Sequence, residues 1–371
     1  MTIKLPSWLN PESATVDMER ITSADVESAL CSDQPGIKEF AALLSSSALD
    51  YLEVMAQKAQ AITRRHFGRT ISLYVPLYLA NYCSGGCVYC GFASDREQPR
   101  RRLEEAEFLI EIDALKEKGF DDILLLTGER SPEADFDYLL NSVSLAAKKF
   151  HNVAVESFAM SMEEYRKLSD AGCTGITLYQ ETYHADLYKE LHRWGTKKDY
   201  AFRVEAPARA LQAGLRMVGL GVLLGLGEPV YDALSLFQHA RYLQKKFWRS
   251  GVMISFPRIC AQQGGFQPEH HVDDSFLARM IFAFRICLPD VPLILSTRER
   301  EKFRDGMAGV GISRMSVESK TTVGGYFHKI DSSEGQFDVN DKRDVKTFCE
   351  MLGEKGLEPV FKNWDSVFQQ G

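Results

Sequence analysis

The chain has 371 residues, of which 45% are hydrophobic and 26% are charged, as in an ordinary soluble globular protein. Its formal net charge is −7 with acidic and basic residues interspersed, which argues against a broad surface for nucleic acid or an anionic membrane. The longest apolar run, at 217–227, is much shorter than the roughly 18 residues of a membrane helix, and the first residues lack the apolar segment of a signal peptide. We therefore expect a cytoplasmic protein that binds neither nucleic acid nor membranes.

Residues 1–70 are polar and amphipathic, with a pattern that predicts helices. From residue 71 onward, short β-rich apolar runs alternate with longer helical patterns, several of which end in glycine, as helices often do. The residues Ser161 to Glu164 form a capping box that predicts a helix start. Eight runs are expected to be strands, at 71–80, 122–128, 153–160, 175–182, 216–225, 252–259, 293–299 and 312–318.

Eight strands joined by helices indicate an α/β fold, a (β/α)8 TIM-type barrel with helical N-terminal and C-terminal extensions. The expected parts are a helical extension at 1–70, the barrel at 71–330 and a C-terminal extension at 331–371. The competing architecture is an open doubly wound sheet. Its usual nucleotide fingerprint, G-x-G-x-x-G, does not match the spacing of the glycine-rich run at 216–225.

Three cysteines, Cys83, Cys87 and Cys90, lie in one short stretch, NYCSGGCVYCGF, directly after the first strand run. The other five cysteines are scattered, which is typical of reduced thiols in a cytoplasm. A structural zinc site usually needs four ligands, and a redox dithiol needs two. Three thiolates can hold three irons of a 4Fe–4S cube and leave the fourth open for a ligand. The spacing therefore favours an open cluster, with zinc as the alternative.

The C-x3-C-x2-C spacing, with an aromatic residue before the third cysteine, resembles the radical S-adenosylmethionine (SAM) enzymes. The resemblance implies a 4Fe–4S cluster whose open iron binds the amino and carboxylate groups of SAM. It also implies that one electron cleaves SAM to methionine and a 5′-deoxyadenosyl radical, which removes hydrogen from a substrate. Tyr89 could then shield the cluster or stack on a ligand, although packing of the loop is the simpler role of such an aromatic residue.

Further residues match positions that contact SAM in this family. The segment TGE at 127–129 ends the second run. Gly128 and Glu129 match the family's GGE, from which Thr127 departs, and the resemblance implies that the acid meets the SAM ammonium group. Arg203 lies where similar enzymes place an arginine for the SAM carboxylate, although arginines are mostly exposed.

Two other positions complete this set. Leu223 lies in a G-x-L-x-G-x-x-E pattern whose family counterpart contacts adenine, with packing of the barrel wall as the alternative. Glu156 ends the third run and could accept hydrogen bonds from ribose hydroxyls.

The segments LYQETYH, SFPRI, LSTRE and the terminal KNWDS extend the resemblance to the aromatic amino-acid lyases, and within them to the tyrosine lyases of thiazole biosynthesis. This implies cleavage of the Cα–Cβ bond of L-tyrosine to dehydroglycine and p-cresol. It also implies a thiazole synthase as recipient of the product, possible complex formation with it, and an external one-electron donor such as flavodoxin. The tryptophan lyases share these motifs and stay an alternative. After residue 318 the chain has only Cys349, which argues against the second cluster of the hydrogenase-maturation lyases.

A cation should bind the carboxylate of an amino-acid substrate, and a bidentate arginine suits it. Arg298 ends the seventh run, on the side where a barrel carries its chemistry, and the resemblance gives it this role. A salt bridge to a neighbouring glutamate is the alternative. Gln180, Glu181 and Tyr183 end the fourth run and could line the same cavity.

Two functions outside the lyase class also remain. A zinc-stabilised binding protein would contain one zinc and no iron. A radical SAM fold without catalysis would serve only as an interaction partner.

Overall fold

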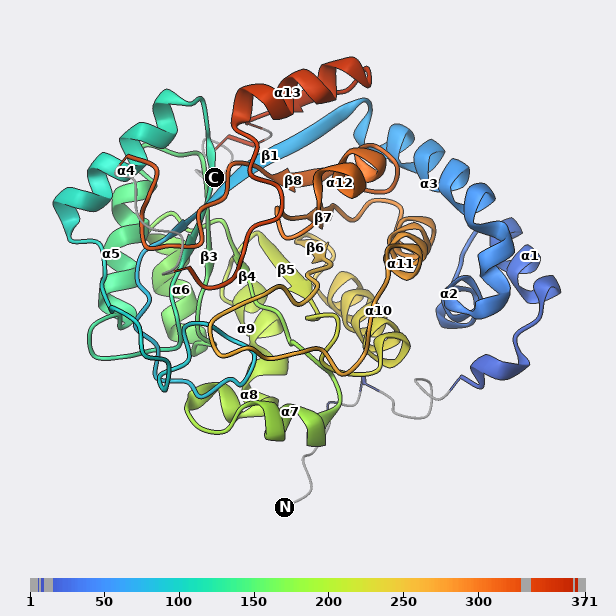
Figure 1. Cartoon of the computed structure of the whole chain (residues 1–371), viewed down its shortest axis with the longest axis horizontal. Coiled ribbons are helices and arrows are strands. Elements are labelled where there is room, and N and C mark those ends of the chain that lie inside the picture. Colours follow the sequence, from blue (N-terminus) through green and yellow to red (C-terminus); the bar gives the residue numbers. More distant parts are fainter. Residues whose placement is uncertain (1–5, 7, 10–15, 328–334, 363, 366–371) are drawn as a thin grey trace.

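The computed structural model describes residues 6, 8–9, 16–327, 335–362 and 364–365. Eight parallel strands form a closed barrel, in which each strand pairs with the next and β8 pairs with β1 (Figure 1). Because β1 pairs with both β2 and β8, the open-sheet alternative is wrong and the barrel is confirmed. The strands are β1 (Thr70–Tyr78), β2 (Asp122–Leu126), β3 (Asn152–Glu156), β4 (Gly175–Thr177), β5 (Met217–Gly221), β6 (Gly251–Ser255), β7 (Leu293–Leu295) and β8 (Arg314–Ser316).

All eight expected runs contain a strand, but several strands are much shorter than their runs. The residues at 178–182, 222–225 and 296–299 lie beyond the ends of β4, β5 and β7, in the loops that leave the barrel. Most of these loop residues are buried, including polar ones such as Gln180 and Thr297. The residues that were expected in strands but lie in loops therefore enclose the barrel mouth.

Helices surround the barrel on the outside (Figure 1). The expected capping box is confirmed at α6, where Ser161 and Glu164 bond reciprocally. None of the described helices has the length and apolarity needed to cross a membrane. The outer elements are α4 (Glu105–Glu117), α5 (Phe136–Ala146), α6 (Met162–Asp170), α7 (Ala185–Leu191), the 3-10 turn η3 (Thr196–Lys198), α8 (Tyr200–Val204), α9 (Ala206–Gln212), α10 (Pro229–Lys246), α11 (Asp274–Cys287) and α12 (Glu301–Met307).

The core has two layers that follow from strand alternation. Side chains of β1 such as Leu73 and Val75 point outward and pack with the helices in the main core. Tyr74 and Tyr78 on the same strand point into the barrel, where a second apolar cluster forms around them. The inner cluster comprises Tyr74, Tyr78, Phe92, Leu124, Leu126, Ala154, Met253 and Ile294. It fills the middle of the barrel.

The N-terminal part is helical, as expected, with α1 (Ser23–Cys31), α2 (Ile37–Leu44) and α3 (Leu52–Phe67). A short turn, η1 (Met18–Arg20), precedes them, and η2 (Ser46–Tyr51) joins α2 to α3. These helices pack on α10 and α11, at the right of Figure 1. Phe40 stacks on Phe237 with a centroid distance of 4.4 Å and meets Phe284 edge-on at 4.7 Å. The N-terminal helices therefore extend the outer layer and stay away from the barrel mouth.

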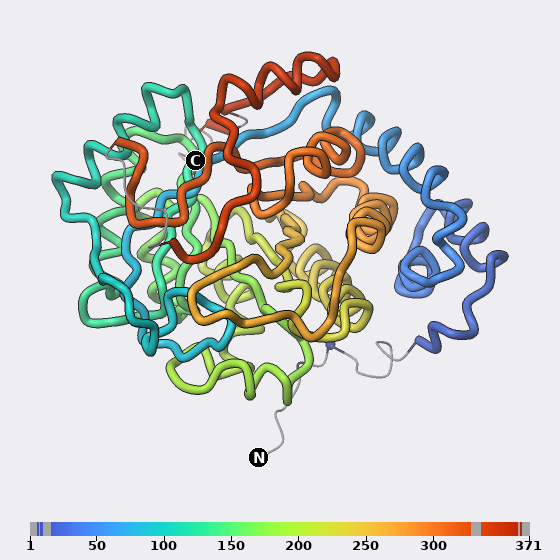
Figure 2. Tube along the Cα trace, in the orientation of Figure 1, coloured from blue at the N-terminus to red at the C-terminus, as the bar shows by residue number. Residues whose placement is uncertain are grey.

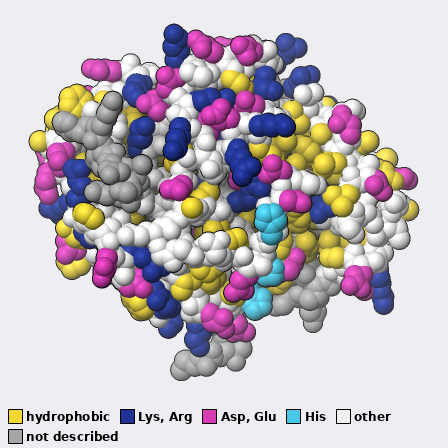
Figure 3. Space-filling view, viewed as in Figure 1, with side chains coloured by type: hydrophobic (Ala, Val, Ile, Leu, Met, Phe, Trp, Pro, Cys, Tyr) yellow, Lys and Arg dark blue, Asp and Glu magenta, His cyan; other side chains and the backbone are white. Residues whose placement is uncertain are grey.

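The C-terminal part contains α13 (Val345–Glu354) and an unexpected ninth strand, β9 (Glu358–Val360), which pairs with the start of β1. Before α13, residues 335–341 run over the loops at the barrel mouth, as the trace in Figure 2 shows. Backbone hydrogen bonds anchor this segment to the residues Thr321, Ala261 and Thr297. Of the motif KNWDS, Asn363 and Ser366 lie outside the described residues. On the face seen in Figure 3, acidic and basic side chains are interspersed.

Candidate active site

The loop after β1 brings the three neighbouring cysteines to the carboxyl end of the barrel. Cys83, Cys87 and Cys90 are free thiols, as are the other five cysteines. Burial raises the pKa of Cys83 to about 11 and that of Cys87 to about 12. Backbone amides nevertheless point at sulfur, because the N–H groups of Gly85 and Glu129 donate to Cys83 Sγ at 3.4 and 3.3 Å. These buried thiols therefore need a cation nearby to become thiolates. Two backbone amides already donate to the sulfur of Cys83.

Arg100 holds the cysteine loop together from within. Its guanidinium donates to four backbone carbonyls, those of Asn81, Phe92, Ala93 and Arg96, at 2.6 to 3.2 Å. Asn81 closes the same loop, donating to Pro99 O and accepting from Arg101 N at 2.8 and 2.7 Å. A short loop without regular structure thus gains a fixed conformation from two side chains.

A second segment, Leu191–Trp194, clamps the cysteine loop from outside. Val88 N donates to Leu191 O and Gly86 N donates to Trp194 O, both at 3.1 Å. A side chain at Gly86 would lie 2.4 Å from the Trp194 ring, so only glycine fits there. The indole Nε1 donates to Ser94 Oγ at 2.9 Å, which places the ring across the loop. The clamp and Arg100 together fix the positions of the cysteines.

The donor set fits an iron–sulfur cube better than a single metal ion. Within the described part of the chain, no three His, Cys, Asp or Glu side chains converge closely enough to hold one ion. In a cube each thiolate binds a different iron, so three sulfurs spread around a shared space suffice. Gly128 leaves that space open, because a Cβ there would lie 2.7 Å from Cys83 Cβ and 2.5 Å from Tyr82 O. The geometry therefore opposes the zinc alternative.

The cysteines face a cavity at the barrel mouth with two connected compartments. The inner compartment contains the three cysteines, and the outer one extends toward Arg298. Residues common to both walls are Cys90, Glu156, Tyr179, Glu181, Lys197 and Gln336. The cavity thus offers adjoining space for a ligand of the cysteine site and for a second molecule.

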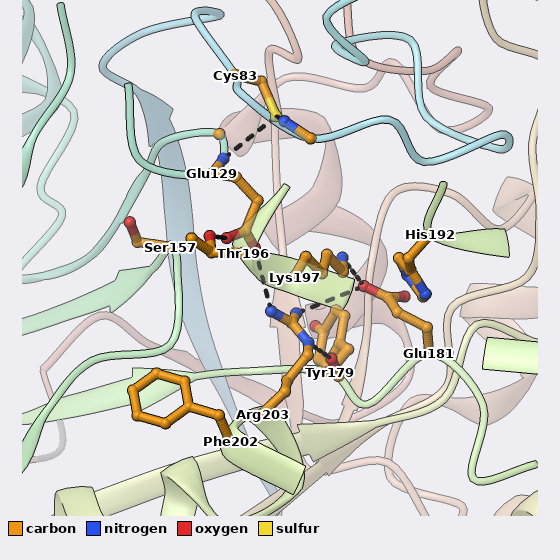
Figure 4. A network of polar contacts seen from close by, with 12 residues as sticks. Cys83, Glu129, Ser157, Tyr179, Glu181, His192, Thr196, Lys197, Phe202 and Arg203 are labelled. Atoms are coloured by element: carbon orange, nitrogen blue, oxygen red, sulfur yellow. Dashed lines mark hydrogen bonds and ion pairs between the residues drawn. The ribbon is translucent and has the colours of Figure 1, made fainter. Parts of the chain in front are cut away.

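A buried ionic network connects the two compartments (Figure 4). Glu129 accepts from Arg203 Nη1 at 3.3 Å and from Thr196 Oγ1 at 3.0 Å. Glu181 accepts from Lys197 Nζ at 2.6 Å and lies 3.7 Å from Arg203 Nη2. Arg203 therefore bridges both acids. It is 5% exposed, so the interpretation of Arg203 as a surface helix arginine is wrong.

Two acidic residues of the cavity wall, Glu181 and Glu156, have an unusual backbone conformation or environment. Glu181 has a φ of 72°, in the left-handed region that a non-glycine residue adopts rarely and mostly under functional constraint. Glu156 ends β3 and makes no hydrogen bond or ion pair with its carboxylate to any other residue that the structure describes. Burial and the nearby charge of Glu181 raise the pKa of Glu156 to about 7. A carboxyl group between both compartments is thus able to hold or release a proton near neutral pH.

Arg298 lies in the wall of the outer compartment after β7. Its guanidinium carbon is 3.3 Å from the centroid of the Phe337 ring, and Nη1 donates to Arg258 O at 3.4 Å. The salt bridge considered for Arg298 does not form with Glu299, which pairs with Arg258 instead. No ion pair joins Arg298 to another residue in the described ranges. The outer compartment thus contains a guanidinium that makes no ion pair with a described residue, in a wall that also carries the carboxyl groups of Glu156 and Glu181.

Tyr89, Gly128 and Leu223 also lie at the cavity. Tyr89 and Leu223 line the outer compartment and pack with Cys87 in one apolar cluster. The glycine-rich run is a strand only up to Gly221, so Leu223 lies in the loop between β5 and α10. Glu228 caps α10 instead of facing the cavity, since its carboxylate accepts from the amides of α10.

The structure does not bring Gln180 and Tyr183 to the cavity wall with the other expected residues. Tyr179 and Glu181 line the wall on either side of Gln180, which is buried behind it. Tyr183 is 1% exposed, and its hydroxyl lies 2.8 Å from Nδ1 of His239 on α10. Tyr183 therefore packs between the barrel and a helix.

Of the six residues common to both walls, three were not expected from the sequence: Tyr179, Lys197 and Gln336. Gln336 accepts from the Tyr78 hydroxyl at 2.7 Å and donates to Cys90 Sγ at 3.5 Å. It comes from the segment that crosses the barrel mouth, far from the cysteines in sequence. Of these three, Tyr179 carried a signal in the sequence, because alternation along the expected strand at 175–182 places it on the same side as Glu181.

Comparisons with known proteins agree with this geometry. Residues 77–239 match the Radical SAM superfamily, and residues 255–358 match the Biotin and Thiamin Synthesis associated domain. The chain is 40% identical to a 2-iminoacetate synthase of Salmonella typhimurium and 39% identical to one of Escherichia coli. Each alignment covers 93% of this chain and 92% of the relative.

A solved structure shows the same arrangement of the whole chain. The crystal structure of HydG, a maturase of the FeFe-hydrogenase, superposes with a TM-score of 0.90 at 32% sequence identity. The superposition covers 96% of this chain and 81% of HydG. The similarity therefore includes the barrel together with its terminal parts.

Proposed function

Because the chain belongs to the radical SAM superfamily and is an enzyme homologous to 2-iminoacetate synthase, we propose that it cleaves the Cα–Cβ bond of L-tyrosine. The products are 2-iminoacetate (dehydroglycine) and p-cresol. The observation that carries this proposal is the guanidinium of Arg298, which makes no ion pair with a described residue, in the compartment next to the three thiols. An amino-acid carboxylate is the partner that this cation lacks.

The superfamily uses a 4Fe–4S cluster and SAM, and Cys83, Cys87 and Cys90 would hold the cluster. When bound and reduced, the cluster and SAM supply the radical that removes a hydrogen atom from the substrate. The enzyme's own task is to orient both molecules and to exclude water. The clamp formed by Leu191–Trp194 and the segment 335–341 support this task by covering the site.

For SAM, the proposed contacts divide between polar and apolar groups. Glu129 would accept from the ammonium group, with Gly128 leaving room for it. Arg203 would attract the carboxylate, and its links to Glu129 and Glu181 hold its guanidinium in place. Leu223 would contact the adenine, and Glu156 would accept from the ribose hydroxyls. Tyr89 would support the ligand from the side of the cluster.

For tyrosine, Arg298 would bind the carboxylate, and its stacking on Phe337 fixes the plane of the guanidinium for a bidentate contact. The cation–acid pair of Lys197 and Glu181 lies across the same compartment. Glu181 would accept from the substrate ammonium group. Gln180 and Tyr183 lie behind the wall, so they would not touch the substrate. They would instead hold the backbone that positions Glu181.

The product and the reductant suggest the partners of the reaction. 2-Iminoacetate is an imine that water destroys, so a thiazole synthase that uses it for thiamin would receive it directly, with or without a stable complex. An external one-electron donor such as flavodoxin would reduce the cluster. The eight free cysteines support a reducing cytoplasm as the location.

One anaerobic assay tests the proposal. The reconstituted enzyme is given equal amounts of tyrosine and tryptophan with SAM and a reductant, and the products are separated. We expect release of p-cresol and about four irons per chain. Turnover of tryptophan alone would overturn the tyrosine assignment within the same reaction class. A colourless protein containing one zinc would show that the three cysteines do not hold an iron–sulfur cluster, and would overturn the proposed activity.

A further inference from the structure

A second cavity lies at the opposite end of the barrel, where the strands begin. Barrel interiors are normally filled by bulky branched side chains. Here β1, β3 and β4 contribute the small residues Ser72, Ala154 and Gly175, and all three line the cavity. The resulting chamber has a volume of ≈ 210 Å³. One water molecule takes about 30 Å³, so the chamber has room for a small organic molecule.

Two arginines line this chamber, and only one has an acidic partner. Arg314 on β8 bonds with both Nη atoms to Asp122 on β2. Its Nε is buried and has no hydrogen-bond partner, and the residue is 7% exposed. Arg216 makes no hydrogen bond or ion pair with its guanidinium to the residues that the structure describes. Its one described contact is the face of the Trp364 ring at 4.7 Å.

The charges of the chamber do not cancel. Two guanidinium groups face one carboxylate, and burial lowers the pKa of Arg216, while Asp122 raises it and Arg314 lowers it further. Asn152 adds a donor, because its Oδ1 accepts from Thr174 and no described residue accepts from its Nδ2. Burial of a cation without a counter-charge is costly, and Arg216 bears part of this cost because it is half-buried. An anion among Arg216, Arg314 and Asn152 would remove this cost.

The chamber is separate from the catalytic cavity. The two cavities have no wall residue in common, and the inner apolar cluster around Tyr74 and Tyr78 lies between them. Met253 belongs to that cluster and also lines the chamber. A ligand in the chamber would therefore not touch SAM or the amino-acid substrate.

We infer that the chamber at the start of the strands is a binding site for a small carboxylate of two to four carbons, held by Arg216 and Arg314. Two features favour a carboxylate over an inorganic anion. The guanidinium fork matches a planar carboxylate, and the side chains of Met217 and Met253 in the wall offer contact for a short apolar group.

Isothermal titration of the full-length protein with sodium acetate tests this inference, with sodium chloride and inorganic phosphate as parallel titrants. We expect acetate to bind, and Arg216→Gln to weaken its binding at least about tenfold, as for loss of a charge-assisted hydrogen bond. Arg249→Gln is the matched control, because Arg249 stacks on Trp248 at the same 4.7 Å but is exposed. Its affinity for acetate should equal that of the unmodified chain.

A second variant separates the chamber from the catalytic cavity, which also contains a cation. Because acetate could also bind Arg298, the titration is repeated in Arg298→Ala, where we expect acetate binding to remain and an added Arg216→Gln to weaken it at least about tenfold. The inference is overturned if the unmodified chain binds no acetate, or if Arg298→Ala loses the binding and Arg216→Gln keeps it. It is equally overturned if chloride or phosphate binds as tightly as acetate. Whether acetate binds at all is decided with the unmodified chain, so that outcome does not depend on the folding of a variant.

Discussion

The hydroxyl of Tyr89 lies 2.6 Å from Nε2 of His192, whose Nδ1 lies 2.6 Å from the carbonyl oxygen of Tyr188. A carbonyl oxygen only accepts, so Nδ1 carries the proton and Nε2 accepts from the Tyr89 hydroxyl. Burial lowers the pKa of His192 to about 2, which keeps the ring neutral. The aromatic residue beside Cys90 is therefore held by the clamp segment.

This pair predicts non-additive stability losses. His192→Phe leaves the buried Tyr89 hydroxyl without an acceptor, and Tyr89→Phe leaves Nε2 without a donor, so each should lower the free energy of unfolding by about 1–3 kcal/mol. The double variant removes both groups and should lose less than the sum of the single losses. Chemical denaturation of the cluster-free chains measures the cycle. Strictly additive losses would show that the contact contributes nothing.

Cys87→Ala should abolish iron binding and p-cresol formation. Two remaining thiolates cannot hold a cube that keeps one open iron, and Cys87 lies at the centre of the clamped loop. Iron content and visible absorption after anaerobic reconstitution measure the effect. Cys31→Ala is the control, since Cys31 is exposed and far from the loop, and it should retain iron and activity. Full iron content in Cys87→Ala would contradict the assignment.

Arg298→Ala should raise the dissociation constant for tyrosine by about tenfold to a hundredfold, because a charge-assisted carboxylate contact contributes about 1.5–3 kcal/mol. The cluster should remain intact. Equilibrium binding of tyrosine to the reconstituted enzyme provides the measurement. Arg300→Ala, two residues along and exposed, should leave tyrosine binding unchanged. Unaltered affinity in Arg298→Ala would remove Arg298 from the substrate site.

Glu156→Gln should change how stability depends on pH. The pKa of Glu156 is about 7 in the folded chain and 4.5 as its ordinary value, so the folded chain holds this proton more tightly than the unfolded chain. Stability therefore falls as pH rises from about 4.5 to 7, by up to about 3 kcal/mol, and stays constant above that. Glutamine cannot ionise and should escape this loss.

Denaturation of the cluster-free chain at pH 5 and pH 8 measures this difference. The stability of Glu156→Gln relative to the unmodified chain should be greater at pH 8 than at pH 5. Glu163→Gln, at a side chain that is 75% exposed, should show no such gain. An equal relative stability of Glu156→Gln at both pH values would mean that Glu156 ionises normally.

Arg100→Lys should make the cluster labile without preventing its assembly. Lysine keeps the charge, but one ammonium group cannot bond to four carbonyls that surround a planar fork. Iron release to a chelator under anaerobic conditions should become faster. Arg101→Lys is the control, since Arg101 is partly exposed and bonds to Glu107. Equal release rates in the two variants would show that Arg100 does not organise the loop.

Sequence patterns predicted the barrel because each strand run is buried on both faces and bounded by helical segments. The ninth strand was missed, since Glu358–Val360 is short and mostly accessible and carries no alternation. The cysteines were predicted from their spacing. Lys197 was not, because TKKD has the composition of a surface turn, and only folding buries its ammonium group against Glu181.

Long-range contacts explain the other omissions. Gln336 reaches Cys90 across 246 positions of sequence, a separation that no local pattern encodes. Gln180 and Tyr183 were expected at the cavity because they follow a strand end. In this segment Leu178, Tyr179 and Glu181 line the wall, whereas Gln180 is buried behind it and Tyr183 bonds to His239 on α10.

The contact between Gln336 and Cys90 has a consequence for biosynthesis of the enzyme. The barrel is complete at Ser316, but the wall that covers the cysteines is not formed until residues 335–341 have been translated. Before residues 335–341 are synthesised, Cys90 lacks this cover, so a shielded cluster requires the nearly complete polypeptide.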